Sequence, residues 1–87
     1  SGVDQLKMNL ARVNIANKLL FINPKPAIKK YAQLMLMNAS KHVSHHFAKQ
    51  KNFEYALYYA KLALAVKFTF KWFAYTLHLT FSSFIKK

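Results

Sequence analysis

One stretch of the chain carries polar and basic side chains at a spacing that could bind an anion. The residues are Asn38, Lys41, His42, His45 and Lys49, at positions i, i+3, i+4, i+7 and i+11. In a helix this spacing places them together, on the side away from the apolar positions of the same segment. Ammonium and imidazole groups gathered in this way can hold an acidic side chain or a C-terminal carboxylate. We predict a carboxylate-binding face here, and the alternative is the ordinary solvated face of an amphipathic helix.

The histidines also suggest a metal site, because His42 and His46 lie one helical turn apart and could share an ion. A stable site normally needs a third protein ligand. The chain has no cysteine and only two acids, Asp4 and Glu54, so His78 would have to come from another segment. We therefore expect ordinary surface histidines, with no metal and no cofactor.

Catalysis has little support in the sequence. Ser44 stands beside His45, but adjacent helical residues point in different directions, and no acid is placed to orient the histidine. A catalytic carboxylate pair would need both acids of the chain to converge, and there is no glycine-rich phosphate loop. We predict no catalytic residue and a non-enzymatic protein.

The charge balance indicates an anionic partner. Lysine and arginine number 14 against two acids, which gives a net charge of +12, and 54% of the residues are hydrophobic. That apolar fraction is too high for a disordered basic tail, so the chain should fold and offer a positive surface. An acidic protein or peptide, a nucleic acid or an anionic membrane could meet it. Arg12 is the only arginine, which weakens the nucleic-acid interpretation because arginine binds phosphates and guanine bidentately.

Glycine and proline are absent from residue 27 onward, which favours long helices. Apolar residues recur at helical spacing, and Asp4 and Pro26 suit the N-cap of the first helix and the first turn of the second. None of these stretches has the roughly 20 apolar residues with few charges that a membrane span needs. We predict one all-α domain over 1–87, an antiparallel hairpin array of four helices at about 4–22, 26–50, 53–67 and 69–86.

The segment from 68 to 85 carries two competing patterns. Its apolar residues form a helical stripe, and threonines and serines form a second, polar stripe. Residues 75–81 also alternate strictly, as a half-buried strand would. A strand over this whole length without a turn residue would be unusual, so we predict a helix. The pattern leaves open whether this segment lies in the core, at an interface or on a membrane. The apolar stripe consists of Phe70, Phe73, Leu77, Phe81 and Phe84.

Aromatic side chains cluster around the third predicted helix and the start of the fourth. With lysines between them, they could stack the bases of single-stranded nucleic acid or lie at a membrane interface. Aromatic residues at helical spacing are more often core, so we predict a core position for most of them. An oligomer or partner contact is expected for the rest, because so small a domain cannot bury them all. The residues are Tyr55, Tyr58, Tyr59, Phe68, Phe70, Trp72, Phe73 and Tyr75.

Residues 40–68 contain features of a helical hairpin with a tight crossing. Phe47 lies near the end of the first helix, an Asn-Phe pair follows at the turn, and Ala56 and Ala63 are seven residues apart. Small residues at these two positions let adjacent helices approach closely. In these features the stretch resembles a tetratricopeptide-type repeat, a helix-turn-helix unit of about 34 residues.

The stretch departs from the family pattern at four positions. Ser40 replaces a large residue, Ser44 a Gly or Ala, and Phe68 a terminal proline, while Lys51 stands where glycine is common. The resemblance implies that the exposed side of the first helix lines a concave binding surface, where Lys41 occupies a position often used to bind peptide carboxylates. It also implies that residues 69–86 form a capping helix over the last apolar face.

These observations predict a helical adaptor that docks an acidic protein or peptide on its basic face. The first alternative is a cationic amphipathic domain that binds or disrupts anionic membranes. The second is a basic subunit of a nucleic-acid-containing assembly. A homo-oligomer is compatible with any of the three.

Overall fold

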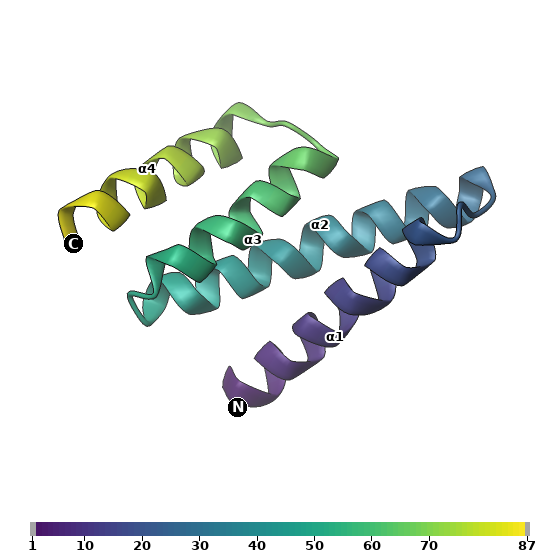
Figure 1. Ribbon diagram of the computed structural model, residues 1–87, viewed down its shortest axis with the longest axis horizontal. Helices are drawn as coiled ribbons and strands as arrows, with labels where there is room; N and C mark the ends of the chain where they lie inside the picture. Colours follow the sequence, from purple (N-terminus) through teal and green to yellow (C-terminus); the bar gives the residue numbers. More distant parts are fainter. Residues whose placement is uncertain (1, 87) are drawn as a thin grey trace.

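Helix α2 (Pro26–Lys49) is the longest helix and forms the middle of the molecule. The computed structural model describes residues 2–86, and within them the chain forms four helices and no strand. Helix α1 (Gly2–Phe21) packs on one side of α2, and α3 (Phe53–Val66) packs on the other. Helix α4 (Phe70–Lys86) lies along α3, and each helix runs antiparallel to the one before it (Figure 1). The predicted all-α hairpin array is confirmed.

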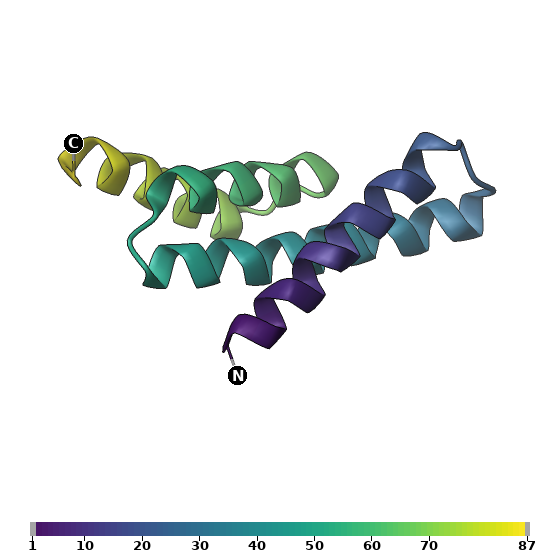
Figure 2. The same ribbon diagram turned by 60° about the horizontal axis from the view of Figure 1, so that its bottom comes forward.

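The array is thin. Its principal extents are 43 × 30 × 18 Å, and a single helix with its side chains is about 10–12 Å across. Viewed from a second direction, α3 and α4 lie on one side of the molecule and α1 crosses α2 obliquely on another (Figure 2). So thin a molecule has little interior, and large apolar side chains must compete for it.

The helix ends differ slightly from prediction. Helix α1 begins at Gly2 and contains Asp4 in its first turn, so the predicted N-cap at Asp4 is wrong. A carboxylate in the first turn interacts favourably with the free amides much as a cap does, so it marks the region of the helix start without fixing the residue. Pro26 is the first residue of α2, as predicted.

The turn between α2 and α3 closes with two backbone hydrogen bonds. The amide of Lys51 donates to the carbonyl of Ala48 at 3.0 Å, and the amide of Asn52 donates to the carbonyl of Phe47 at 2.9 Å. Lys51 adopts a left-handed conformation with φ of 61°. This pattern is a Schellman motif, in which glycine usually holds the left-handed position. The turn sends α3 back along α2.

The contact between α2 and α3 is built from small side chains. Ala56, Ala60 and Ala63 are fully buried, and so is Ser44 on α2. The Ser44 hydroxyl donates to the carbonyl oxygen of Ala56 at 2.7 Å, which joins the two helices directly. Because these side chains are short, the helix backbones can approach closely.

A second apolar cluster joins α1 to α2. It is made of Val13, Ala16, Leu36 and Ala39, with Leu20 and Met35 packed against it. Here too the most buried residues include alanines, and Ala16 is fully covered. The two clusters hold the long middle helix between two neighbours and leave its remaining face uncovered.

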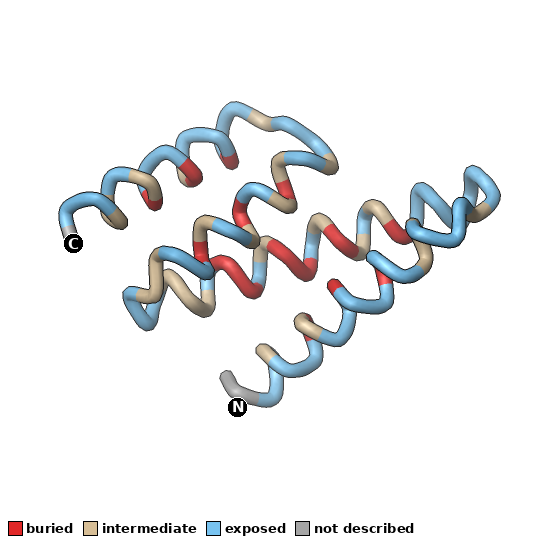
Figure 3. The backbone as a smooth tube through the Cα atoms, viewed as in Figure 1, coloured by how far each residue is buried: buried red, intermediate tan, exposed pale blue. Residues whose placement is uncertain are grey.

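Helix α4 is helical as predicted, but it buries the side opposite to the predicted apolar stripe. Trp72, Thr76 and Leu79 are buried against α3, while Phe70 and Phe81 are 84% and 65% exposed. The buried positions of α4 face α3 and its outer turns are open (Figure 3). The hydroxyl of Thr76 donates to the carbonyl of Trp72 at 2.9 Å, so this threonine can be buried without an unpaired hydrogen-bonding group.

The predicted core position of the aromatic cluster is therefore wrong for most of its members. Trp72 is buried, and Tyr59 and Tyr75 are partly buried. The physical reason is that the array is thin and α4 packs on a narrow surface of alanines on α3. Trp72 and Leu79 already cover this surface, so no space is left for further aromatic rings. The exposed members are Tyr55, Tyr58, Phe68, Phe70 and Phe73.

Candidate anion-binding groove

The uncovered face of α2 is hollowed along much of its length. Three hollows, of about 560, 260 and 320 Å³, lie over it. The first two share His42 and the last two share His45, so they adjoin. Helix α1 lines the first two hollows and α4 lines the third. We call this continuous surface the α2 groove.

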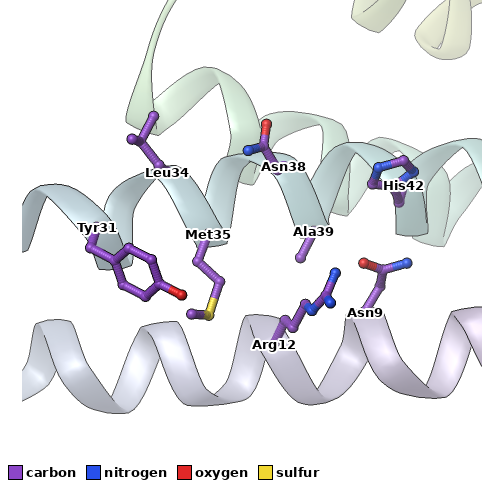
Figure 4. A pocket seen from close by; sticks show the side chains of 8 residues that line it. All are labelled: Asn9, Arg12, Tyr31, Leu34, Met35, Asn38, Ala39 and His42. Atoms are coloured by element: carbon purple, nitrogen blue, oxygen red, sulfur yellow. The ribbon is translucent and has the colours of Figure 1, made fainter.

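The first hollow lies between α1 and α2. Arg12 and Asn9 rise from α1 toward α2, beside Ala39 and Met35, and the ring of Tyr31 lies at one end (Figure 4). The guanidinium group is thus presented to the groove over an apolar floor. Guanidinium groups bind carboxylates in two places at once, which makes this end of the groove suited to an acidic group.

Asn9 is only 8% exposed. Its amide nitrogen donates to the carbonyl of Gln5 at 3.0 Å, but its Oδ1 atom is buried and accepts no hydrogen bond from the described residues. A buried acceptor without a partner costs roughly 1–3 kcal/mol. An amide oxygen accepts hydrogen bonds, so a donor such as water or a ligand N–H group would satisfy it, and a carboxylate would not.

The middle hollow adjoins both others, because it shares His42 with the first and His45 with the third. Gln5 and Asn9 reach it from α1, and a row of imidazole and ammonium groups reaches it from α2. The row consists of His42, His45, His46 and Lys49.

The third hollow is centred on Trp72. The indole nitrogen of this residue donates to the carbonyl of Ala60 at 2.9 Å, which fixes the ring on α3. The ammonium group of Lys41 stands 5.2 Å from the centroid of the same ring, in a cation–π contact. Thr69 and Lys71 complete the rim from the start of α4.

Thr69 also sets the start of α4. Its side-chain oxygen accepts from the amide of Trp72 at 3.2 Å, and its carbonyl accepts from the amide of Phe73 at 2.9 Å. This is the bonding of an N-cap residue. The cap therefore positions Lys71 and Trp72 at the entrance of the third hollow.

His45 joins α2 to α4 through ring contacts. Its ring centroid lies 5.5 Å from that of Trp72 and 4.9 Å from that of Tyr75. Partial burial against these rings lowers the pKa of His45, and the positive charges of His42, Lys49 and Lys41 lower it further. An anion placed beside His45 would offset these positive charges and favour its protonated form.

All the charged side chains that line the three hollows are basic. Arg12 comes from α1, Lys41 and Lys49 from α2, and Lys71 from α4, and no aspartate or glutamate is among the lining residues. The hollow on α3 differs, because Glu54 lines it together with three tyrosines. The hollows of the α2 groove thus together present basic side chains from three helices.

The five residues predicted for the carboxylate-binding face all line this groove, but they divide between its ends. Asn38 and His42 belong to the first hollow, and Lys41 and His45 to the third. Lys49 belongs to the middle hollow, which both histidines also line.

The sequence did not predict the groove residues that come from α1 and α4. Gln5, Asn9 and Arg12 come from α1, while Lys71 and Trp72 come from α4. One signal was present, because Gln5, Asn9 and Arg12 fall at i, i+4 and i+7 and interrupt the apolar pattern of the first helix on one side. No pattern within the chain indicated that α4 would turn Trp72 toward α2.

Among residues 2–86, no group of three or more histidine, cysteine or acidic side chains gathers in a way that could hold a metal ion. In the same part of the chain, no helix combines the length and the apolar character needed to cross a membrane.

Comparisons with known proteins give no relative from which a function could be transferred. No family model matches the chain, and no significant match was found among curated proteins or solved structures.

Proposed function

We propose that this chain is a non-enzymatic helical adaptor whose α2 groove binds an acidic segment of a protein or peptide. The observation that carries the proposal is a set of adjoining hollows on α2 that presents Arg12, Lys41 and Lys71 from three helices and that no acid lines. Attraction between a basic concavity and an acidic segment gives orientation and rapid association.

The shape of the groove supports an extended or helical segment as the ligand. Arg12 on α1 and Lys71 on α4 line different hollows, and His42 and His45 line the hollow that adjoins both. A ligand with several carboxylates along its length could contact both ends at once. The resemblance of residues 40–68 to a tetratricopeptide-type hairpin agrees with this proposal, because in that family the equivalent helix face binds peptides.

The mechanism is binding by preformed groups. Trp72 is fixed by its bond to Ala60, and it holds Lys41 above its ring. An ammonium group that is already positioned loses less side-chain entropy when a carboxylate arrives. Protonation of His45 would add a further positive charge when the ligand is present.

The test is calorimetric titration with a peptide rich in aspartate and glutamate and with a matched peptide of asparagine and glutamine. The acidic peptide should bind at one site, and the amide peptide should not. The K41E/K71E variant should weaken binding at least about tenfold, since attraction turns to repulsion within the groove.

The matched control is K29E/K30E, which changes net charge equally on exposed positions near the start of α2, away from Lys41 and Lys71. It should change affinity by less than about threefold, the small effect expected of remote, screened charges. Equal weakening by both double variants would show that bulk charge, and not the groove, attracts the peptide. Equal binding of single-stranded nucleic acid, with steep salt dependence, would favour the nucleic-acid alternative instead.

A further inference from the structure

The outer face of α4 is a run of apolar side chains that the described structure leaves uncovered. Phe70, Phe73, Leu77, Phe81 and Phe84 recur every three or four residues and therefore lie along one side of the helix. All five are exposed, with Phe84 at 74%. We call this face the α4 stripe. Exposed apolar patches of this kind mark contact sites.

The stripe is not a by-product of a loosely packed helix. The opposite side of α4 is fixed by the bond of the Trp72 indole to Ala60 and by the burial of Leu79. Threonines on the inner side satisfy their hydroxyls within the helix, where Thr80 donates to the carbonyl of Thr76 at 3.0 Å. The fold thus holds the stripe outward in a defined orientation.

Charge indicates what covers the stripe. Lys71 and His78, seven residues apart, lie along one flank of it, and Lys67 precedes the helix. No acid occurs anywhere from residue 55 to the end of the chain. A helix with an apolar face and basic residues beside it is suited to lie in the surface of an anionic membrane, where lysines meet lipid phosphates and aromatic rings enter the acyl boundary.

A second copy of the chain is a poor occupant for the same reason. Each copy carries a net charge of +12, and pairing two stripes would bring the lysines beside them close together. Within the described residues α4 lacks the length and apolar character needed to cross a bilayer, so the contact we consider is one in the plane of the interface. We propose that the α4 stripe docks this protein onto an anionic membrane surface.

This inference does not rest on peptide binding by the α2 groove. The stripe and the groove occupy different sides of α4, and Lys71 stands at the edge between them. A variant of the stripe leaves Arg12, Lys41 and Lys71 in place. Failure of membrane docking and failure of peptide binding are therefore distinguishable in the same preparation.

The experiment is co-sedimentation with phosphatidylcholine vesicles and with phosphatidylcholine–phosphatidylserine vesicles. The protein should bind the anionic vesicles and bind the neutral ones weakly. The L77S/F81S variant should lower the partition coefficient at least about tenfold, because two buried apolar side chains are lost. The matched control F21S/I22S removes two exposed apolar side chains at the α1–α2 turn and should stay within about twofold.

The proposal is overturned if the unaltered chain does not sediment with the anionic vesicles. It is also overturned if L77S/F81S binds them as well as the unaltered chain does, or if F21S/I22S lowers the partition coefficient as much as L77S/F81S does. It is also overturned if analytical ultracentrifugation shows a dimer that L77S/F81S dissociates, since a second copy would then cover the stripe.

A second readout does not depend on the serine variant. The chain has no cysteine, so Phe81→Cys can carry a single polarity-sensitive dye, whose emission should rise with anionic vesicles while that of Phe21→Cys stays unchanged. No rise at Phe81→Cys contradicts the proposal.

Discussion

The inner and outer faces of α4 differ in their side chains and in their contacts with the rest of the molecule. The inner face carries one tryptophan, a leucine and hydrogen-bonded threonines, and it is buried on the alanines of α3. The outer face carries all four phenylalanines of the helix and is exposed. The difference shows that hydrophobicity alone did not select the buried side. The buried side is the one that fits the narrow alanine surface of α3. It is also the side whose indole and hydroxyl groups find hydrogen-bond partners.

The largest expected effect is a difference in stability between a substitution on the inner face and one on the outer face. Trp72→Ala should lower the free energy of unfolding by about 3–5 kcal/mol, because a buried aromatic ring and its hydrogen bond are lost. Phe81→Ala removes an exposed ring and should stay within about 0.5 kcal/mol. Urea denaturation followed by far-UV circular dichroism measures both. Similar losses in the two variants would mean that the outer face is also covered in solution.

A second prediction tests the alanine surface on which the inner face rests. Ala60→Leu should cost about 1–3 kcal/mol, because the added carbons have no space beneath Trp72. Ala65→Leu is the matched control on the exposed side of α3 and should change stability by less than about 0.5 kcal/mol. Thermal melts of the two variants compare them directly, and an unchanged melting temperature for Ala60→Leu would refute the close contact.

The smallest effect concerns His45, which touches the inner-face rings. Its pKa is lowered in the folded protein, so the unfolded chain takes up this proton first as pH falls. Stability that is present above the usual histidine pKa of about 6.5 should decline as pH falls through that value toward the folded pKa.

His45→Gln should show less of this decline, and NMR titration of the imidazole should show the lowered pKa directly. Phe81→Ala should leave the titration of His45 unchanged, because it alters only the outer face. An imidazole that titrates at the ordinary value would contradict the packing of His45 against Trp72 and Tyr75.

Much of the fold followed from local patterns in the sequence. The scarcity of glycine and proline, Pro26 and the alanines of the third helix predicted four helices and a close crossing at Ala56. The left-handed residue at the turn fell on Lys51, where the family resemblance leads one to expect glycine. These features depend on residues near one another in the chain, which is why they could be read from it.

The face that α4 buries could not be read in the same way. Both of its stripes have helical periodicity, and choosing between them depends on the carbonyl of Ala60, twelve residues away, which accepts from Trp72. The groove shows the same limit. The α2 face was predicted residue by residue, from Asn38 to Lys49, but its walls come from α1 and α4, whose placement is a matter of tertiary packing.

The central claim is that an acidic segment binds along the α2 groove, and two unique NMR signals test it most directly. The chain has one arginine and one tryptophan, at opposite ends of the groove. Addition of an acidic peptide should shift both the Arg12 Nε–H and the Trp72 Nε1–H resonances, with one saturation curve. If the peptide binds while neither resonance moves, or while only one does, the proposed groove is not the binding site.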